Sequence, residues 1–278
     1  HSPVDRPPVG ELRRADGTRL QTLSRATLDG LPAWRSHPPE EFVVKAADRS
    51  TDLHGVLYKP HDFDPARKYP VIEVIYGGSQ SSAIPKGFTD YRAYFGQAPG
   101  LAQLGFITFI VDARGTPGRG REFQSVAYGS LGRHEIPDHV AALKQLADRR
   151  PYMDLSRVGI IGHSFGGYLA TRALLLAPDV YHVGVASAAP YVSESGPSWV
   201  FMFPLEDHRE AYEYASNLRL AGNLKGKLLL IQGTSDTEVP FSHTMKMVEA
   251  LIRADKPYDL MVMPGVGHRI RNMPPYWR

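Results

Sequence analysis

The sequence predicts an α/β fold with a doubly wound, mostly parallel sheet and helices on both faces. From Phe42 onward, short β-branched or aromatic runs bounded by Gly and Pro alternate with segments whose apolar residues have helical spacing. Strands that alternate with helices pair in parallel through right-handed crossovers. A length of 278 residues favours one large α/β domain over two small ones.

The individual elements follow from these patterns. Pro137 suits the first turn of a helix, and Asp138 adds negative charge where that helix begins. The helix continues through the apolar positions Val140, Leu143, Leu146 and Ala147. Two more helices are expected over residues 168–177 and 242–253. Strands are expected over residues 53–59, 71–76, 106–112, 157–162, 183–188, 227–232 and 260–263.

Residues 1–40 differ from the rest because they are rich in Pro, Arg and short turns. A turn at Ala15-Asp16-Gly17-Thr18 predicts a hairpin between residues 11–14 and 19–23. We therefore expect an N-terminal extension or linker over residues 1–40 and the α/β domain over residues 41–278.

Composition excludes several classes of function. The absence of cysteine rules out disulfides, thiolate nucleophiles and cysteine-ligated zinc. The net charge is only +3, and we expect the cluster of Arg114, Arg119 and Arg121 to be a solvated surface rather than a nucleic-acid site. No apolar run reaches the roughly 18 residues needed to cross a bilayer, so no membrane partner is expected. No metal or cofactor is expected either, and the compartment stays open.

A candidate nucleophile lies in Gly162-His163-Ser164-Phe165-Gly166, which fits G-x-S-x-G between a predicted strand and a predicted helix. In the α/β-hydrolase fold this turn exposes the serine hydroxyl, and the glycines allow strand and helix to approach closely. The alternatives are a chance glycine-rich turn and a phosphate-binding turn. The motif predicts an α/β-hydrolase fold with Ser164 as nucleophile.

The base and its orienting acid are expected later in the chain, in the order acid then histidine. Asp236 and His268 each follow a predicted strand on a glycine-containing loop. Asp236 could instead be a turn or helix-cap residue, and His268 a surface histidine. Other histidines are weaker candidates because none follows the last strand; they are His134, His139, His163 and His243.

An oxyanion formed at Ser164 needs hydrogen-bond donors placed in advance. The backbone N–H of Phe165, directly after the nucleophile, is one candidate. Tyr76, which ends the predicted strand 71–76, is the other, through its phenol or its backbone N–H. A tyrosine that merely fills the core at the end of a strand is the alternative.

The chain contains five recognisable motifs: Lys68-Tyr69-Pro70-Val71, Tyr76-Gly77-Gly78, Asp112-Ala113-Arg114-Gly115, Gly162-His163-Ser164-Phe165-Gly166-Gly167-Tyr168 and Gly233-Thr234-Ser235-Asp236. Together they resemble the catalytic domain of the prolyl oligopeptidase family of serine peptidases, in particular its dipeptidyl peptidase IV branch. The resemblance implies Ser164, Asp236 and His268 as a catalytic triad and Tyr76 as an oxyanion donor. It also implies a β-propeller ahead of this domain, whose last strands residues 9–24 resemble, so the chain is expected to be a fragment or an excised domain.

Three functions remain open from the sequence. Tyr191, Trp199 and Phe201 are expected to line an apolar acyl pocket. Because the propeller that would restrict access is missing from this sequence, hydrolysis of carboxyl esters, including bulky or polymeric ones, is favoured. Peptide cleavage of the dipeptidyl or prolyl type and a non-catalytic interaction domain are the alternatives. A small molecule, a peptide or a polymeric ester would be the substrate, and exposed apolar surface could form a homodimer.

Overall fold

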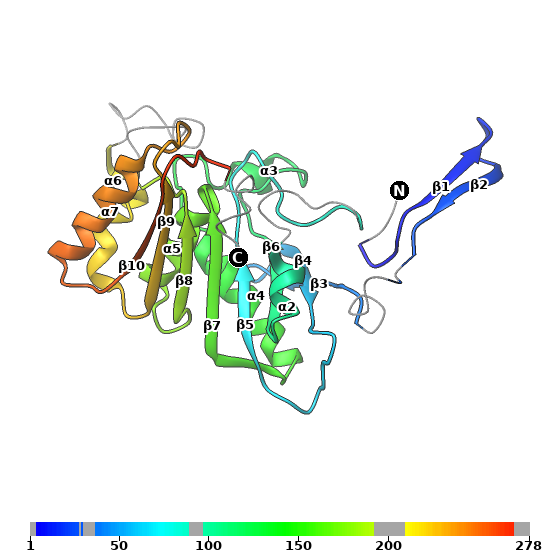
Figure 1. Cartoon of the computed structure of the whole chain (residues 1–278), viewed down its shortest axis with the longest axis horizontal. Coiled ribbons are helices and arrows are strands. Elements are labelled where there is room, and N and C mark those ends of the chain that lie inside the picture. The colour runs from blue at the N-terminus through cyan, green and yellow to red at the C-terminus, as the bar shows by residue number, and fades with distance from the viewer. Residues whose placement is uncertain (1–3, 28, 30–36, 89–96, 192–208, 270–278) are drawn as a thin grey trace.

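The computed structural model describes residues 4–27, 29, 37–88, 97–191 and 209–269. An eight-stranded sheet forms its centre, and Figure 1 shows the strands side by side in the order β10-β9-β8-β7-β5-β6-β4-β3. Their bounds are β3 (Glu40–Lys45), β4 (Asp52–Tyr58), β5 (Tyr69–Val74), β6 (Ile107–Asp112), β7 (Met153–His163), β8 (Val183–Ser187), β9 (Lys227–Gly233) and β10 (Asp259–Met263).

Most of this sheet is parallel, as the sequence predicts. From β6 to β10 every neighbouring pair runs in parallel. The exceptions lie at one edge, where β4 is antiparallel to both β3 and β6. A short turn joins β3 to β4, with the N–H of Ala46 donating to the carbonyl of Thr51 at 2.8 Å. The carboxyl ends of β5, β7, β9 and β10 therefore meet at one edge of the sheet.

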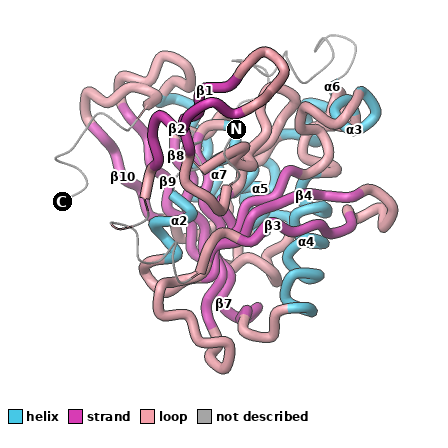
Figure 2. Tube along the Cα trace, turned by 90° about the vertical axis from the view of Figure 1, so that its right-hand side faces the viewer, coloured by secondary structure: helices cyan, strands magenta, loops and turns pink. Residues whose placement is uncertain are grey.

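Helices cover both faces of the sheet, and Figure 2 shows α2 on one side of the strands with α4 and α5 on the other. Successive side chains of a strand point to opposite faces of the sheet, so each strand contributes apolar side chains to both layers of helices. In β6, Ile110 packs with α2, whereas Phe109 and Val111 face the larger core. The helices are α2 (Gln97–Ala102), α3 (Arg121–Ser125), α4 (Glu135–Arg149), α5 (Phe165–Leu176), α6 (Arg209–Ala215), the 3-10 helix η2 (Leu218–Asn223) and α7 (Phe241–Arg253).

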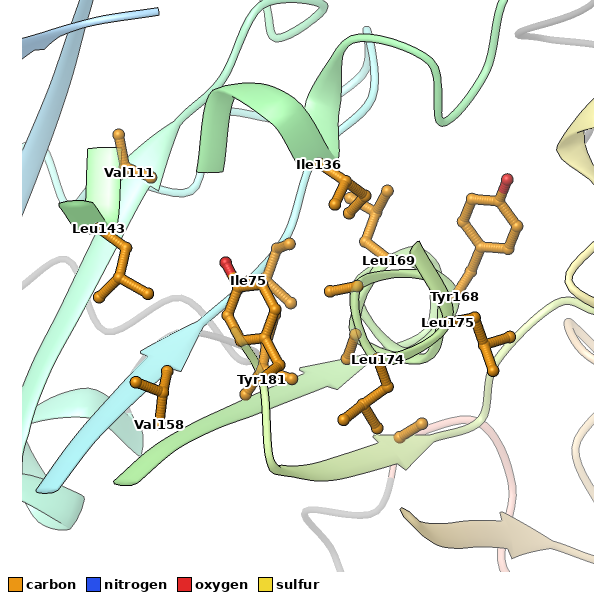
Figure 3. Packing of buried hydrophobic residues seen from close by; sticks show 14 of the residues in the cluster. Ile75, Val111, Ile136, Leu143, Val158, Tyr168, Leu169, Leu174, Leu175 and Tyr181 are labelled. Carbon is orange, nitrogen blue, oxygen red and sulfur yellow. The ribbon is translucent and has the colours of Figure 1, made fainter. Parts of the chain in front are cut away.

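The larger core holds helix α5 in place. Leu169 and Leu174 are fully buried, and Figure 3 shows them among side chains of the sheet and its neighbouring elements, including Ile75 and Val158. Burial of one leucine side chain contributes about 2 kcal/mol. Because α5 begins directly after Ser164, this packing also fixes the position of the candidate nucleophile.

The expectation that Arg114 is solvated is wrong. Its guanidinium donates to both carboxylate oxygens of Asp138 at 2.8 Å, and Asp138 is fully buried. Asp138 also accepts a hydrogen bond from the N–H of Ala47 at 2.9 Å. It therefore ties the first turn of α4 to two loops, beyond adding charge where the helix begins. The ion pair makes Arg114 part of the scaffold.

A second sheet is the hairpin of β1 (Val9–Arg13) and β2 (Arg19–Arg25), which agrees with the sequence-based expectation. Figure 1 shows it standing away from the main sheet. Its leucines, Leu12, Leu20 and Leu23, are exposed. The division of the chain at residue 40 stays a prediction.

A buried polar cluster links α4 to the sheet. Nδ1 of His139 lies 2.5 Å from Oε1 of Glu73, and the Tyr181 hydroxyl donates to Oε2 of Glu73 at 2.6 Å. All three side chains are buried. Burial alone lowers the pKa of His139, but the negative charge of Glu73 and the hydrogen bond to it outweigh burial, so the pKa is raised above its ordinary value.

We expect Glu73→Gln to lower the free energy of unfolding by about 3 kcal/mol near pH 6, because it leaves a buried imidazolium without its partner. Stability derived from a raised histidine pKa is complete below about pH 6.5 and is lost as the pH rises through the folded-state value. The deficit of the variant should therefore shrink between pH 6 and pH 9. Urea denaturation at both pH values measures it, with exposed Glu249→Gln as the control. A deficit equal at both pH values would contradict this assignment.

Candidate active site

The candidate nucleophile lies on a strained turn. Ser164, between β7 and α5, has φ 56° and ψ −124°, a conformation that L-residues rarely adopt. A Cβ atom at Gly162 would lie 2.1 Å from the carbonyl oxygen of Gly166. A Cβ atom at Gly166 would lie 2.3 Å from the carbonyl oxygen of Ile75. Glycine at both positions is therefore what allows the turn to close against β5.

Three sequence-predicted residues meet at this turn. Nε2 of His268 lies 2.9 Å from Oγ of Ser164, and Nδ1 of His268 lies 2.8 Å from Oδ2 of Asp236. Asp236 follows β9 and His268 follows β10, so neighbouring parallel strands bring them together. Both side chains are buried, whereas Ser164 is half-buried. The arrangement allows the imidazole to accept the serine proton while the carboxylate fixes its orientation.

Asp236 is held by partners that sequence reasoning missed. Its Oδ2 accepts from Nε2 of Gln232 at 3.1 Å, and its Oδ1 accepts from the backbone N–H groups of Glu238 and Val239 at 3.0 and 2.8 Å. Gln232 is fully buried and accepts from the Thr244 hydroxyl at 3.0 Å. Its signal in the sequence is a polar residue that follows the otherwise apolar run 228–231. These bonds fix the carboxylate plane.

The expected oxyanion donors lie beside the same turn. Tyr76 lies two residues after the end of β5, and its ring meets the Phe165 ring edge-on with centroids 6.4 Å apart. The N–H of Phe165 lies at the first position of α5, where helix N–H groups have no partner within the helix. Their role in binding an oxyanion stays a prediction.

Of the three residues expected to line the acyl pocket, only Tyr191 lies within the described residues. Tyr191 is buried, and its hydroxyl lies 2.8 Å from the Thr171 hydroxyl of α5. Trp199 and Phe201 lie outside the described residues. The pocket therefore stays a prediction.

His163, directly before the candidate nucleophile, has a distinct environment. Its Nδ1 lies 2.7 Å from the Ser187 hydroxyl, and its ring centroid lies 4.9 Å from that of His268. Burial, reinforced by the neighbouring charge of His268 when protonated, lowers the pKa of His163 to about 4. His163 is therefore neutral across the physiological range.

The described residues contain neither a metal-binding cluster nor a membrane-spanning helix. Within the described ranges, no group of three or more His, Asp or Glu side chains is arranged to hold a metal ion. Within the same ranges, no helix combines the length and the apolar character needed to cross a bilayer.

The mostly parallel sheet, the serine turn after β7, and the acid and histidine after later strands define the α/β-hydrolase fold. The family model described as "Prolyl oligopeptidase family" matches residues 93–274, well over half of the chain. The chain therefore belongs to the prolyl oligopeptidase family.

Several similar proteins are named as dipeptidyl peptidases or aminopeptidases. Human dipeptidyl peptidase 8 is 37% identical over 84% of this chain and 26% of its own length. A crystal structure of a putative dipeptidyl aminopeptidase IV from Bacteroides ovatus has a TM-score of 0.88 and 32% identity, covering 97% of this chain and 38% of the other. Dipeptidyl peptidase 4 from Porphyromonas gingivalis has a TM-score of 0.83 and 31% identity, with the same coverage of both chains.

These comparisons decide the class of protein. The chain is a serine hydrolase. Its membership of a peptidase family favours peptide cleavage. The sequence favoured ester hydrolysis instead, and nothing in the comparisons supports that expectation. The chain spans about a quarter of the length of the human relative. The activity and substrates of the whole protein are therefore a matter for proposal.

We expect Gly162→Ala to lower the free energy of unfolding by about 3 kcal/mol, because the added methyl group would collide with backbone rather than with a movable side chain. Gly100→Ala in α2 is the control, since the same methyl group would meet nothing within 4 Å and alanine favours a helix. Chemical denaturation of both variants measures the difference. Equal stability of the two variants would show that the turn tolerates a side chain.

His163→Phe should leave the shape of the pH profile of kcat/KM unchanged between pH 5.5 and pH 9. A histidine whose pKa is about 4 is already neutral throughout this range and does not titrate there. Hydrolysis of a small acyl p-nitroanilide by both proteins measures the profiles. A shift of the acid limb in the variant would mean that His163 titrates within the range.

Proposed function

We propose that this chain is the catalytic part of a serine peptidase of the dipeptidyl peptidase type, which removes dipeptides from the N-termini of peptides. The observation that carries the proposal is the continuous hydrogen-bonded chain from Ser164 through His268 to Asp236 on a strained serine turn. The names of the relatives support the substrate class.

The first half of the reaction uses all three residues. Oγ of Ser164 attacks the scissile carbonyl carbon while Nε2 of His268 accepts the hydroxyl proton. Asp236 holds Nδ1–H of the imidazole and stabilises the imidazolium that forms. The carbonyl oxygen becomes an oxyanion, which the Phe165 N–H and Tyr76 stabilise; the loss of one such donor costs about 3 kcal/mol in subtilisin.

The second half returns the protein to its starting state. The imidazolium donates its proton to the departing amine, the C–N bond breaks, and an acyl-enzyme remains on Ser164. Water then attacks the ester carbonyl, His268 accepts a proton from that water, and the proton returns to Oγ as the acid product leaves. Hydrogen bonds from Gln232 and from the N–H groups of Glu238 and Val239 hold the Asp236 carboxylate beside the imidazole.

The test compares Ser164→Ala, Asp236→Asn and the parent chain in covalent labelling by a fluorophosphonate and in hydrolysis of Gly-Pro p-nitroanilide. Ser164→Ala should lose labelling and turnover. Asp236→Asn should reduce kcat by about 10⁴, as the equivalent change does in the chymotrypsin-type triad, because the imidazole then adopts the wrong tautomer.

Ser156→Ala, which changes an exposed serine, is the matched control and should label like the parent. Undiminished labelling of Ser164→Ala would remove the nucleophile assignment. If the parent cleaves a p-nitrophenyl ester but leaves the anilide intact, the peptidase proposal is wrong and ester hydrolysis replaces it.

A further inference from the structure

Glu238 lies at the mouth of the candidate site without belonging to its hydrogen-bonded chain. Its Oε2 is 3.7 Å from Nε2 of His268, the ring nitrogen that faces Ser164. Its side chain is 62% exposed, although the imidazole beside it is buried. The carboxylate therefore has one side against the reacting atoms and the other open to solvent.

The backbone of Glu238 is fixed by the same site. Its N–H donates to Oδ1 of Asp236 at 3.0 Å, so the residue stands at a constant position relative to the candidate acid. At 3.7 Å the carboxylate is too far from Nε2 for a hydrogen bond, and Ser164 already occupies that nitrogen at 2.9 Å. Glu238 is thus placed beside the proton transfer without accepting the proton.

Among the described residues, the charge of Glu238 has no permanent counter-ion. In the part of the chain that the structure describes, no lysine or arginine forms an ion pair with it. Asp48 and Asp138 differ from Glu238 in this respect, because each forms an ion pair with Arg114. An exposed carboxylate on a backbone held in place attracts a cation that arrives with a ligand.

We propose that Glu238 is a specificity-determining residue that favours substrates carrying a positive charge, an ammonium or a guanidinium, next to the scissile bond. The proposal rests on the function proposed above, because it requires Ser164 to be the residue that is acylated. The cation is supplied either by the N-terminal amine of a peptide or by a basic side chain near the cut.

The exposure of Glu238 sets how strongly a cationic substrate should be preferred over a neutral one. Two opposite unit charges about 4 Å apart in water gain a factor of about five in rate or affinity. Added salt shortens the Debye length from about 10 Å at 0.1 M to about 3 Å at 1 M. Because Glu238 is open to solvent, the ratio of the cationic rate to the neutral rate should therefore fall towards one at high salt. A residue with a purely structural role would produce neither the preference nor its salt dependence.

The test measures the rate at which Ser164 is labelled by two fluorophosphonates of equal length, one ending in a methyl group and one in an ammonium group. The parent should prefer the cationic probe about five-fold at low salt. Glu238→Gln should remove this preference while still reacting with the neutral probe, and Glu238→Lys should reverse it. Glu249→Gln, which changes a carboxylate of similar exposure on α7, should behave like the parent.

Two pairs of peptide anilides identify the source of the cation. Gly-Pro anilide is compared with its N-acetyl form, and acetyl-Lys-Pro anilide with acetyl-norleucyl-Pro anilide. A preference that Glu238→Gln abolishes in the first pair assigns the cation to the N-terminal amine, and one abolished in the second pair assigns it to the side chain.

Labelling by both probes with the same ratio in the parent and in Glu238→Gln would overturn the role of Glu238 and leave the proposed function standing. Absence of labelling in the parent would instead overturn the proposed function, and the role of Glu238 with it. The two failures are therefore distinguishable.

Discussion

The close approach of backbone segments around Ser164 is the constraint on which the rest of the structure depends. A methyl group on Gly162 would overlap the carbonyl of Gly166, and a methyl group on Gly166 would overlap the carbonyl of Ile75. Gly233 has the same constraint, since its Cβ would lie 2.2 Å from the carbonyl oxygen of Val266 on the histidine loop. Both loops of the candidate site are thus positioned by backbone contact, which is stiffer than contact between flexible side chains.

Hydrogen bonding between the loops continues the sheet beyond its strand ends. The N–H of Ser164 donates to the carbonyl of Ser187 at 2.8 Å, and the N–H of Ala188 donates to that of Ile231 at 2.8 Å. The N–H of Ser235 likewise donates to the carbonyl of Val266 at 3.0 Å. The register of the parallel strands is therefore transmitted to the loops, which is how a serine and a histidine 104 residues apart meet within hydrogen-bond distance.

Features that depend on local pattern were predictable from the sequence, and features that depend on distant partners were not. Glycine spacing located the serine turn and the loops after predicted strands that carry the acid and the histidine. Apolar periodicity located the long helices. Helix α2 was missed because it contains Pro99 and Gly100, which argue against a helix. Arg172 is fully buried because Gly132, Tyr214, Ala215 and Asn217 accept its hydrogen bonds, and no periodicity reveals partners about 40 residues away.

The turn that carries Asp236 couples the orientation of the imidazole to the charge at the mouth of the site. Oδ2 of Asp236 is shared between His268 and Gln232, while Oδ1 is bound by the N–H groups of Glu238 and Val239. The same N–H bond that satisfies Oδ1 holds the Glu238 backbone in place. A change in the conformation of this turn therefore displaces the outer carboxylate and loosens the inner one together, so substrate preference and imidazole orientation share one structural support.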